Sequence, residues 1–174
     1  ATRDRSDWSL TCYSSTAHPD AHTKAFRQTA DRWRDVRALS DEALTELIVS
    51  DEIDILIDLS GHAPHNRLLT FTHKPAPLQV AWGDYVDTRG VAAIDVLIGD
   101  ATHTPPKDDE RYVERVVRLP TDYVCYVPPP YLPPATQAPA LKAGCMTFGT
   151  FSELTKIQPE TIRLWSEVLK ANPD

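Results

Sequence analysis

Two apolar runs in the middle of the chain, Ile53-Asp-Ile-Leu-Ile-Asp-Leu59 and Leu78-Gln-Val-Ala-Trp82, indicate how the chain folds. The first run is rich in β-branched residues, which predicts a central strand that is buried on both faces. The second run predicts the next strand. The segment 64–73 between them predicts a helix that ends before Pro75 and Pro77, because proline lacks the backbone N–H that a helix needs. A strand–helix–strand order of this kind is typical of parallel sheets.

The same alternation extends to both sides of these runs. Apolar spacing and helix caps predict further strands over 8–13, 33–36, 94–98 and 115–119, and further helices over 19–31 and 40–50. Ser40 is a good N-cap residue for the second of these helices. We therefore predict an α/β fold with a mainly parallel sheet.

Prolines mark a change of organisation near residue 128. Pro128-Pro-Pro130 and Pro133-Pro134 predict a stiff, extended segment, because neighbouring prolines favour the polyproline conformation. We place the domain boundaries around this segment, with a first domain at 1–127, a proline-rich crossover linker at 128–144 and the start of a second domain at 145–174.

The turn within Phe148-Gly-Thr-Phe-Ser-Glu-Leu-Thr-Lys156-Ile-Gln-Pro159 is the strongest sign of a binding site. A strand predicted over 146–151 runs through this turn into a helix predicted over 159–171. The free N–H groups and the positive dipole end at the start of a helix suit an anionic phosphate. Lys156 adds a full positive charge. From these residues alone, an exposed loop lysine is the more common explanation.

Other polar residues near predicted strand ends have two explanations each. His62 follows Gly61 at the carboxyl end of a strand, where open α/β sheets bind ligands, but it could equally cap the following helix. Asp100 follows the strand over 94–98 and could face a cleft or shape a turn. The histidine pairs at 18/22 and 62/65 lack further ligands at suitable spacing, so we predict no metal site.

Composition excludes several classes of function. The formal net charge is −7 and the basic residues are scattered, so neither a nucleic acid nor an anionic membrane is an expected partner. No apolar run approaches the roughly 20 residues of a membrane-spanning helix. The three cysteines lack C-x-x-C spacing, which favours free thiols in the cytoplasm. The polar opening without a starting methionine leads us to expect that the chain begins inside a longer protein.

Three segments together resemble the catalytic region of the O-GlcNAc transferase (SPINDLY-like) family. Asp54-Ile-Leu-Ile-Asp-Leu-Ser-Gly61-His62, followed by Asn66-Arg67, is similar to that family's strand–glycine–helix element. Lys74-Pro-Ala-Pro-Leu-Gln-Val-Ala-Trp82 resembles its Arg/Lys-Pro-Ala-Pro-x-Gln-x-x-Trp signature. Phe148 to Pro159 resembles its Phe-x-x-Phe-x-x-Leu-x-Lys-Ile-x-Pro turn. The order and spacing agree over residues 8–172, which is nearly the whole chain.

The resemblance implies an incomplete GT-B-type glycosyltransferase, with a first Rossmann-like domain and the first strand and helix of a second, donor-binding Rossmann-like domain. Such an enzyme transfers N-acetylglucosamine from UDP-GlcNAc to Ser or Thr hydroxyls of proteins, with inversion and without a metal or cofactor. Its partners are the nucleotide-sugar donor and a protein acceptor, and it often carries tetratricopeptide repeats. We expect the chain alone to be inactive, because much of the donor domain is missing.

The resemblance also implies roles for individual residues. Lys156 falls on the position whose lysine contacts the donor diphosphate and helps the leaving group depart. Glu153 falls where the family usually has an amide side chain near the nucleotide, and a carboxylate cannot donate a hydrogen bond to uracil. The loop that faces the donor supplies Thr88 and Gly90, and the acceptor-side element supplies His62 and Arg67.

The donor-facing loop departs from the family pattern. The family commonly reads Trp-Leu-Gly-Tyr-Pro-Gly-Thr-x-Gly, whereas this chain has Trp82-Gly-Asp-Tyr-Val-Asp-Thr-Arg-Gly90. The carboxylates of Asp84 and Asp87 would repel a diphosphate unless Arg89 compensates for them. Asp84, Asp87 and Glu153 favour one alternative function, a non-catalytic binding or scaffold domain that kept the glycosyltransferase fold.

Overall fold

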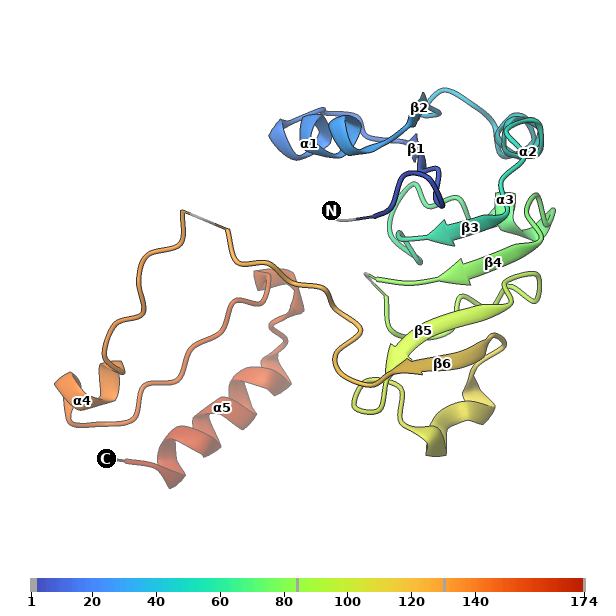
Figure 1. The fold of residues 1–174 in the computed structure, drawn as a ribbon. Coiled ribbons are helices and arrows are strands. Elements are labelled where there is room, and N and C mark those ends of the chain that lie inside the picture. Colours follow the sequence, from blue (N-terminus) through green and yellow to red (C-terminus); the bar gives the residue numbers. More distant parts are fainter. Residues whose placement is uncertain (1–2, 84, 130, 174) are drawn as a thin grey trace. The chain divides into compact units, whose positions relative to one another are not determined.

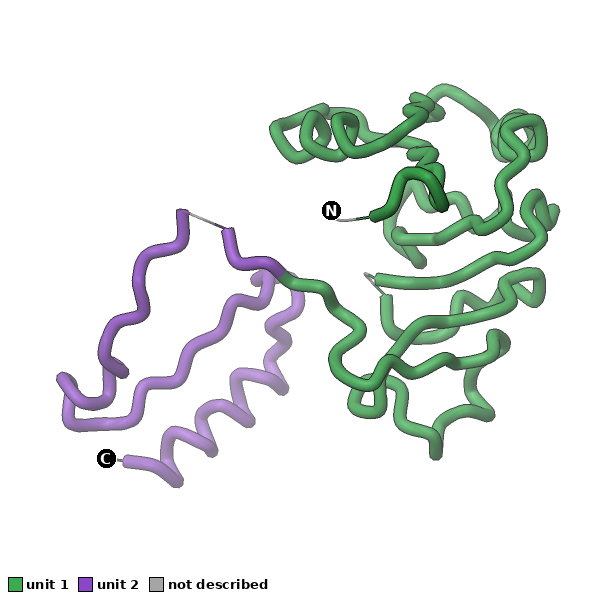
Figure 2. Tube along the Cα trace, viewed as in Figure 1, with its two compact units in different colours: residues 1–126 green, residues 127–174 purple. Residues whose placement is uncertain are grey.

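The computed structural model describes residues 3–83, 85–129 and 131–173. The chain divides into two compact units, residues 1–126 and residues 127–174 (Figure 2). Within the described ranges, the strands belong to the first unit, and the second unit holds two α-helices and a short 3-10 helix. Among the described residues, no helix is both long enough and apolar enough to cross a membrane.

The first unit is built on parallel β-structure, as the sequence predicts. Its strands are β1 (Thr11–Ser14), β2 (Arg32–Asp35), β3 (Ile55–Asp58), β4 (Leu78–Ala81), β5 (Val96–Asp100) and β6 (Arg115–Leu119). β1 and β2 form one parallel pair, and the other strands form a second parallel sheet in the order β3-β4-β5-β6 (Figure 1). The α/β class with a parallel sheet is therefore confirmed.

Helices connect these strands. They are α1 (Ala21–Thr29), α2 (Asp41–Ser50), α3 (Leu68–Thr72) and the 3-10 helix η1 (Pro106–Arg111). Ser40 caps α2, because its hydroxyl accepts a hydrogen bond from the Ala43 N–H at 3.2 Å. α3 is shorter than the predicted segment 64–73 and begins only after Arg67.

The prediction that 53–59 forms a central strand buried on both faces is wrong. β3 is the edge strand of its sheet, and its side chains alternate between the interior and solvent. Leu56 and Asp58 are buried, whereas Ile55 and Ile57 are 39% and 44% exposed. An apolar, β-branched run predicts that a strand forms. It does not reveal whether that strand lies at the centre or at the edge of the sheet.

The core of the first unit joins α2 and α3 to the strands. Leu44 and Ile48 of α2 pack with Leu68 and Phe71 of α3. The strands and loops add further buried residues to the same cluster, namely Val36, Leu56, Ala76, Ala81, Ile94 and Leu97. This core supports the carboxyl ends of β3 and β4, from which the loops described below emerge.

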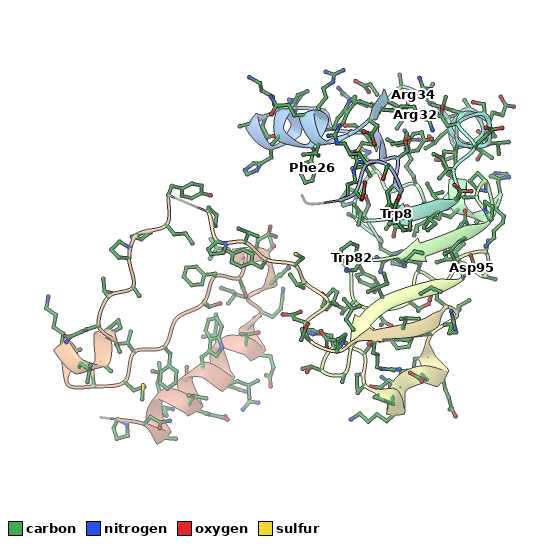
Figure 3. All side chains as sticks on the ribbon, in the orientation of Figure 1. Trp8, Phe26, Arg32, Arg34, Trp82 and Asp95 are labelled. Atoms are coloured by element: carbon green, nitrogen blue, oxygen red, sulfur yellow. The ribbon has the colours of Figure 1, made fainter. Side chains whose placement is uncertain are left out.

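Asp51, at the end of α2, ties that helix to β1 and β2. Its carboxylate accepts hydrogen bonds from the Tyr13 hydroxyl at 2.8 Å and from Arg34 Nη2 at 2.6 Å, and it also contacts Arg32 Nη1 at 3.3 Å. Figure 3 shows Arg32 and Arg34 together at β2. The hydrogen bond from Arg34 is the main reason that the pKa of Asp51 lies below its usual range.

We expect Asp51→Asn to lower the free energy of unfolding by about 2 kcal/mol at pH 7, because the amide loses charge-assisted bonds to two arginines. Since the folded-state pKa of Asp51 is lowered, its contribution is present above the unfolded-state pKa of about 4 and is lost as the pH falls through the folded-state value. Urea denaturation at neutral pH and near pH 3 measures the effect, and the difference from wild type should shrink in acid.

The exposed Asp54 provides a matched control for this prediction. Asp54→Asn should leave the free energy of unfolding nearly unchanged at both pH values, because surface substitutions away from specific contacts have small effects. An Asp51→Asn penalty that keeps the same size in acid would show that the charge of Asp51 is not its cause.

The second unit contains α4 (Pro139–Ala143), the 3-10 helix η2 (Leu154–Lys156) and α5 (Pro159–Ala171). The helix predicted over 159–171 is confirmed. The strand predicted over 146–151 is wrong, because the described residues of this segment form no regular structure. An extended segment becomes a strand only when a neighbour satisfies its N–H and C=O groups, and the described part of this unit offers no such neighbour.

Candidate functional site

Two loops meet at the carboxyl ends of neighbouring strands of the first unit. Gly61 and His62 follow β3. Residues 85–90 follow β4 and belong to the loop that the resemblance leads us to expect beside the donor (the donor-facing loop). His62 Nε2 lies 3.3 Å from the Thr88 carbonyl oxygen. The His62 ring also stands edge-on to the Tyr85 ring, with the ring centroids 5.0 Å apart. His62 therefore contacts the donor-facing loop and does not cap α3, since α3 begins at Leu68 and its N-cap residue is Arg67, with no side-chain cap bond.

Gly61 allows this close approach. Its φ is +52°, in the left-handed region that favours glycine. A Cβ atom at this position would lie 2.6 Å from Tyr85 Cβ and 3.4 Å from Arg89 Cζ. Any larger residue at position 61 would push the donor-facing loop away from β3.

Arg89 fastens the donor-facing loop to β3. Its side chain is fully buried, and Nε donates a hydrogen bond to Asp58 Oδ2 at 2.7 Å. Nη1 donates to the carbonyl oxygens of Tyr85 and Asp87. The guanidinium thus points into the unit. The exposed carboxylate of Asp87 forms no ion pair among the residues that the structure describes, and Arg89 pairs with Asp58 instead of compensating for it. Asp84 lies outside the described residues.

Glu114, the residue just before β6, holds the same loop from the other side. One carboxylate oxygen accepts the Arg89 backbone N–H at 2.8 Å, and the other accepts the Thr88 hydroxyl at 2.7 Å. The Thr88 hydroxyl also accepts the Gly90 N–H at 3.0 Å. Glu114 is 3% exposed. The hydroxyl of Thr88 therefore shapes the loop, and the exposed Gly90 has an open surface above its backbone.

Arg67 contacts a different part of the first unit from His62, namely the loop between β2 and α2. Its guanidinium donates to the carbonyl oxygens of Val36 and Leu39, each at 3.0 Å, and contacts Asp41 Oδ1 at 3.3 Å. It thereby joins the start of α3 to the loop between β2 and α2. Arg67 also borders a cavity of about 350 Å³, which is lined in addition by Ser15, Ala17, Arg37, Leu39 and His65. No contact described in the structure links Arg67 to His62.

Lys156 and Glu153 belong to the second unit. Glu153 precedes η2, and Lys156 is its last residue, three positions before the start of α5. Both side chains are exposed, and the described residues form no hydrogen bond or ion pair with the Lys156 ammonium group. Gln158 occupies the N-cap of α5 without a side-chain bond to the first turn. The helix N–H groups therefore keep their capacity to bind an anion beside Lys156.

Asp100 shapes a turn, which settles one alternative left open by the sequence. Its buried carboxylate accepts the N–H groups of Thr102, His103 and Tyr123 at 2.8, 2.8 and 3.2 Å. These bonds, led by that from His103, hold the pKa of Asp100 far below its usual range. Asp100, His103 and Asp122 are close enough together to hold a metal ion. Because the Asp100 oxygens are already occupied, we assign this group to turn geometry.

The first unit matches a family of known class. The family model described as Glycosyl transferase family 41 matches residues 1–126, the part of the chain that forms the parallel α/β unit and its polar loops. The chain belongs to glycosyl transferase family 41.

Particular relatives have known names. The chain is 38% identical to a protein of Solanum lycopersicum over 99% of its length and 35% identical to one of Arabidopsis thaliana over 98%, each named a probable UDP-N-acetylglucosamine--peptide N-acetylglucosaminyltransferase SPINDLY. It spans 19% of each of these relatives. A solved structure of a Thermobaculum terrenum O-GlcNAc transferase with a lysine-to-methionine mutation is 44% identical, with a TM-score of 0.87 over 97% of this chain and 32% of that one.

Proposed function

We propose that this chain is part of the catalytic region of an inverting transferase that moves N-acetylglucosamine from UDP-GlcNAc to Ser or Thr hydroxyls of proteins. The observation that carries the proposal is the exposed Lys156, three positions before the start of α5, whose N-cap makes no side-chain hydrogen bond. The names of the relatives support the donor and the protein acceptor. The chain covers a small share of those relatives, so the proposal concerns a longer protein that contains it.

The chemistry explains why a lysine is useful at this position. When the bond between sugar and diphosphate breaks, the departing diphosphate gains negative charge. A positive group placed there stabilises the transition state more than the ground state. Many glycosyltransferases of another fold use a metal held by an Asp-x-Asp motif, and the sequence contains no such motif. In this proposal the Lys156 ammonium group and the N–H groups of α5 supply the positive charge.

The first unit would contribute contacts to the donor and the acceptor. We assign donor contacts to Gly90 and the backbone around Thr88, and an acceptor-side role to His62, which lies beside Thr88. Glu153 would lie near the nucleotide. In this assignment residues 1–127 form the first catalytic domain, 128–144 the crossover linker and 145–174 the start of the donor-binding domain. We place the protein in the cytoplasm, with neither nucleic acid nor membrane as a partner.

One observation favours a second candidate function, a scaffold domain that no longer binds a donor. Asp87 leaves an exposed carboxylate on the donor-facing loop, and Arg89 is used by Asp58 instead of neutralising it. A carboxylate near the donor diphosphate weakens binding by electrostatic repulsion. The two functions differ in their response to UDP, which the transferase binds and the scaffold does not.

We predict that residues 1–174 alone do not transfer N-acetylglucosamine, whereas the longer protein does. The second unit of this chain has no buried residue among those described, so it lacks the packed core that a donor-binding domain requires. Incubation of each protein with radiolabelled UDP-GlcNAc and a serine-rich acceptor protein measures transfer. Label incorporated by residues 1–174 at a rate similar to that of the longer protein would refute the prediction.

A further inference from the structure

Arg89 is a buried cation beside the donor-facing loop that the proposed function does not use. Its side chain has no exposed surface, and that of its partner Asp58 is 4% exposed. Removing an arginine from water costs several kcal/mol, which attraction and hydrogen bonds must offset. Nonpolar residues of similar volume often stabilise a fold at least as well as a buried ion pair. Stability alone therefore does not explain this arginine.

The bonds of Arg89 indicate what it does. Nε reaches across to Asp58, at the end of β3, while Nη1 turns back to the carbonyl oxygens of Tyr85 and Asp87 in its own loop. The backbone N–H of Arg89 is held by Glu114. One guanidinium thus fixes both the position of the donor-facing loop against β3 and the internal shape of that loop. A planar fork of donors can do this, whereas a single ammonium group cannot.

Asp58 links this arrangement to the acceptor-side element. Its carboxylate accepts the N–H groups of Ser60 and Gly61 as well as the Arg89 guanidinium, with the Gly61 N–H at 3.0 Å from Oδ2. Gly61 in turn precedes His62, which contacts the Thr88 carbonyl. A single carboxylate therefore sets the positions of the loop that follows β3 and the loop that follows β4.

We propose that Arg89 is a positioning residue that sets the geometry of the donor-facing loop relative to His62 and thereby determines the affinity for the nucleotide-sugar donor. The inference rests on the proposed function. It assigns to Arg89 no contact with the substrate. In the proposed function the loop holds the donor in the ground state and the transition state alike, so a looser loop removes uniform binding, which raises the KM and leaves kcat nearly unchanged.

One matched pair of substitutions tests this in the longer protein. Arg89→Lys keeps the charge beside Asp58 but cannot also bind the two loop carbonyls. We expect it to raise the KM for UDP-GlcNAc about tenfold while kcat changes less than about threefold. The control is Arg118→Lys, because Arg118 also joins a carboxylate and a carbonyl oxygen, those of Asp109 and Thr104, but lies on β6 away from this loop. The KM of the Arg118→Lys variant for UDP-GlcNAc should remain at the wild-type value.

A double variant separates positioning from a purely structural role. Asp58→Asn combined with Arg89→Met removes both buried charges, while the amide oxygen at position 58 can still accept the Ser60 and Gly61 N–H groups, which should restore much of the stability lost in Arg89→Met alone. If Arg89 positions the loop, the KM for the donor stays raised in the double variant, because the carbonyls of Tyr85 and Asp87 still lack their donor. Recovery of both stability and KM, or a wild-type KM in Arg89→Lys, would overturn the proposal.

Hydrogen exchange gives a readout that does not depend on activity. In Arg89→Lys the amides of Gly61, Arg89 and Gly90 should exchange at least about tenfold faster, while those of β5 and β6 remain at wild-type rates. Unchanged exchange at these three amides would overturn the positioning role even if the enzyme is active. A longer protein with no transfer activity, but with faster exchange in the variant, would refute the proposed function and leave the positioning of the loop intact.

Discussion

Lys156→Ala should lower the kcat for transfer of N-acetylglucosamine by about 100- to 1000-fold in the longer protein, which is the size expected when one transition-state charge donor is removed. The ammonium group lies before the N-terminus of α5, and the described residues do not neutralise it. Its attraction grows as the diphosphate departs, so the loss should fall mainly on kcat and less on the KM for the donor. Steady-state kinetics with varied UDP-GlcNAc measure both constants.

Lys170 is the matched control for this substitution. It is also exposed and belongs to α5, but it lies in the last turn of that helix. Lys170→Ala should therefore leave kcat within about twofold of wild type, as expected for a surface charge far from a developing charge. Equal activity of Lys156→Ala and Lys170→Ala would remove Lys156 from the mechanism.

Gly61→Ala should destabilise the first unit by about 3 kcal/mol. A non-glycine residue in the left-handed region costs about 1–2 kcal/mol, and displacement of packed neighbours adds a similar amount. The added Cβ would lie 2.6 Å from Tyr85 Cβ, so the donor-facing loop must move. Urea denaturation followed by circular dichroism measures the change in the free energy of unfolding.

Substitution of Gly90 separates the cost of the left-handed backbone from the cost of the contact with Tyr85. The φ of Gly90 is +68°, but a Cβ at position 90 would meet no atom within 4 Å. Gly90→Ala should therefore cost only the backbone strain, about 1 kcal/mol. Similar losses in Gly61→Ala and Gly90→Ala would show that the contact with Tyr85 is not important for stability.

Local patterns were sufficient to predict much of the first unit. The Ser40 cap and the acidic first turn that follows it predict α2, and the structure places that helix at Asp41–Ser50. The strand predicted over 115–119, which has Val116 and Val117 near its centre, coincides with β6. These elements follow from residues that are neighbours in the sequence, which is why capping and periodicity identify them.

Long-range pairing was not predictable in the same way. The edge position of β3 depends on which strands lie beside it, and the missing strand at 146–151 depends on a partner that the described part of the second unit does not contain. The candidate site also depends on pairing between residues that are far apart in the sequence. Arg89 could be suspected from its charge, but its pairing with Asp58, 31 residues away, requires the fold.

Glu114 is the clearest example of a site residue that local sequence patterns do not identify. It is a buried carboxylate that fixes both Thr88 and Arg89 from just before β6, 25 or more residues along the chain. Nothing in its local sequence distinguishes it from the exposed acidic residues of the preceding 3-10 helix η1. Residues that shape a binding loop from a distance are recognised only when the strands are placed side by side.

Isothermal titration calorimetry of the longer protein with UDP tests the central claim, that Lys156 helps to bind the donor diphosphate, most directly. The transferase function predicts saturable binding in the micromolar range, with an affinity that falls at least about tenfold in Lys156→Ala because the diphosphate loses a charged partner. Absence of UDP binding by a folded longer protein, or binding that Lys156→Ala leaves unchanged, would contradict it.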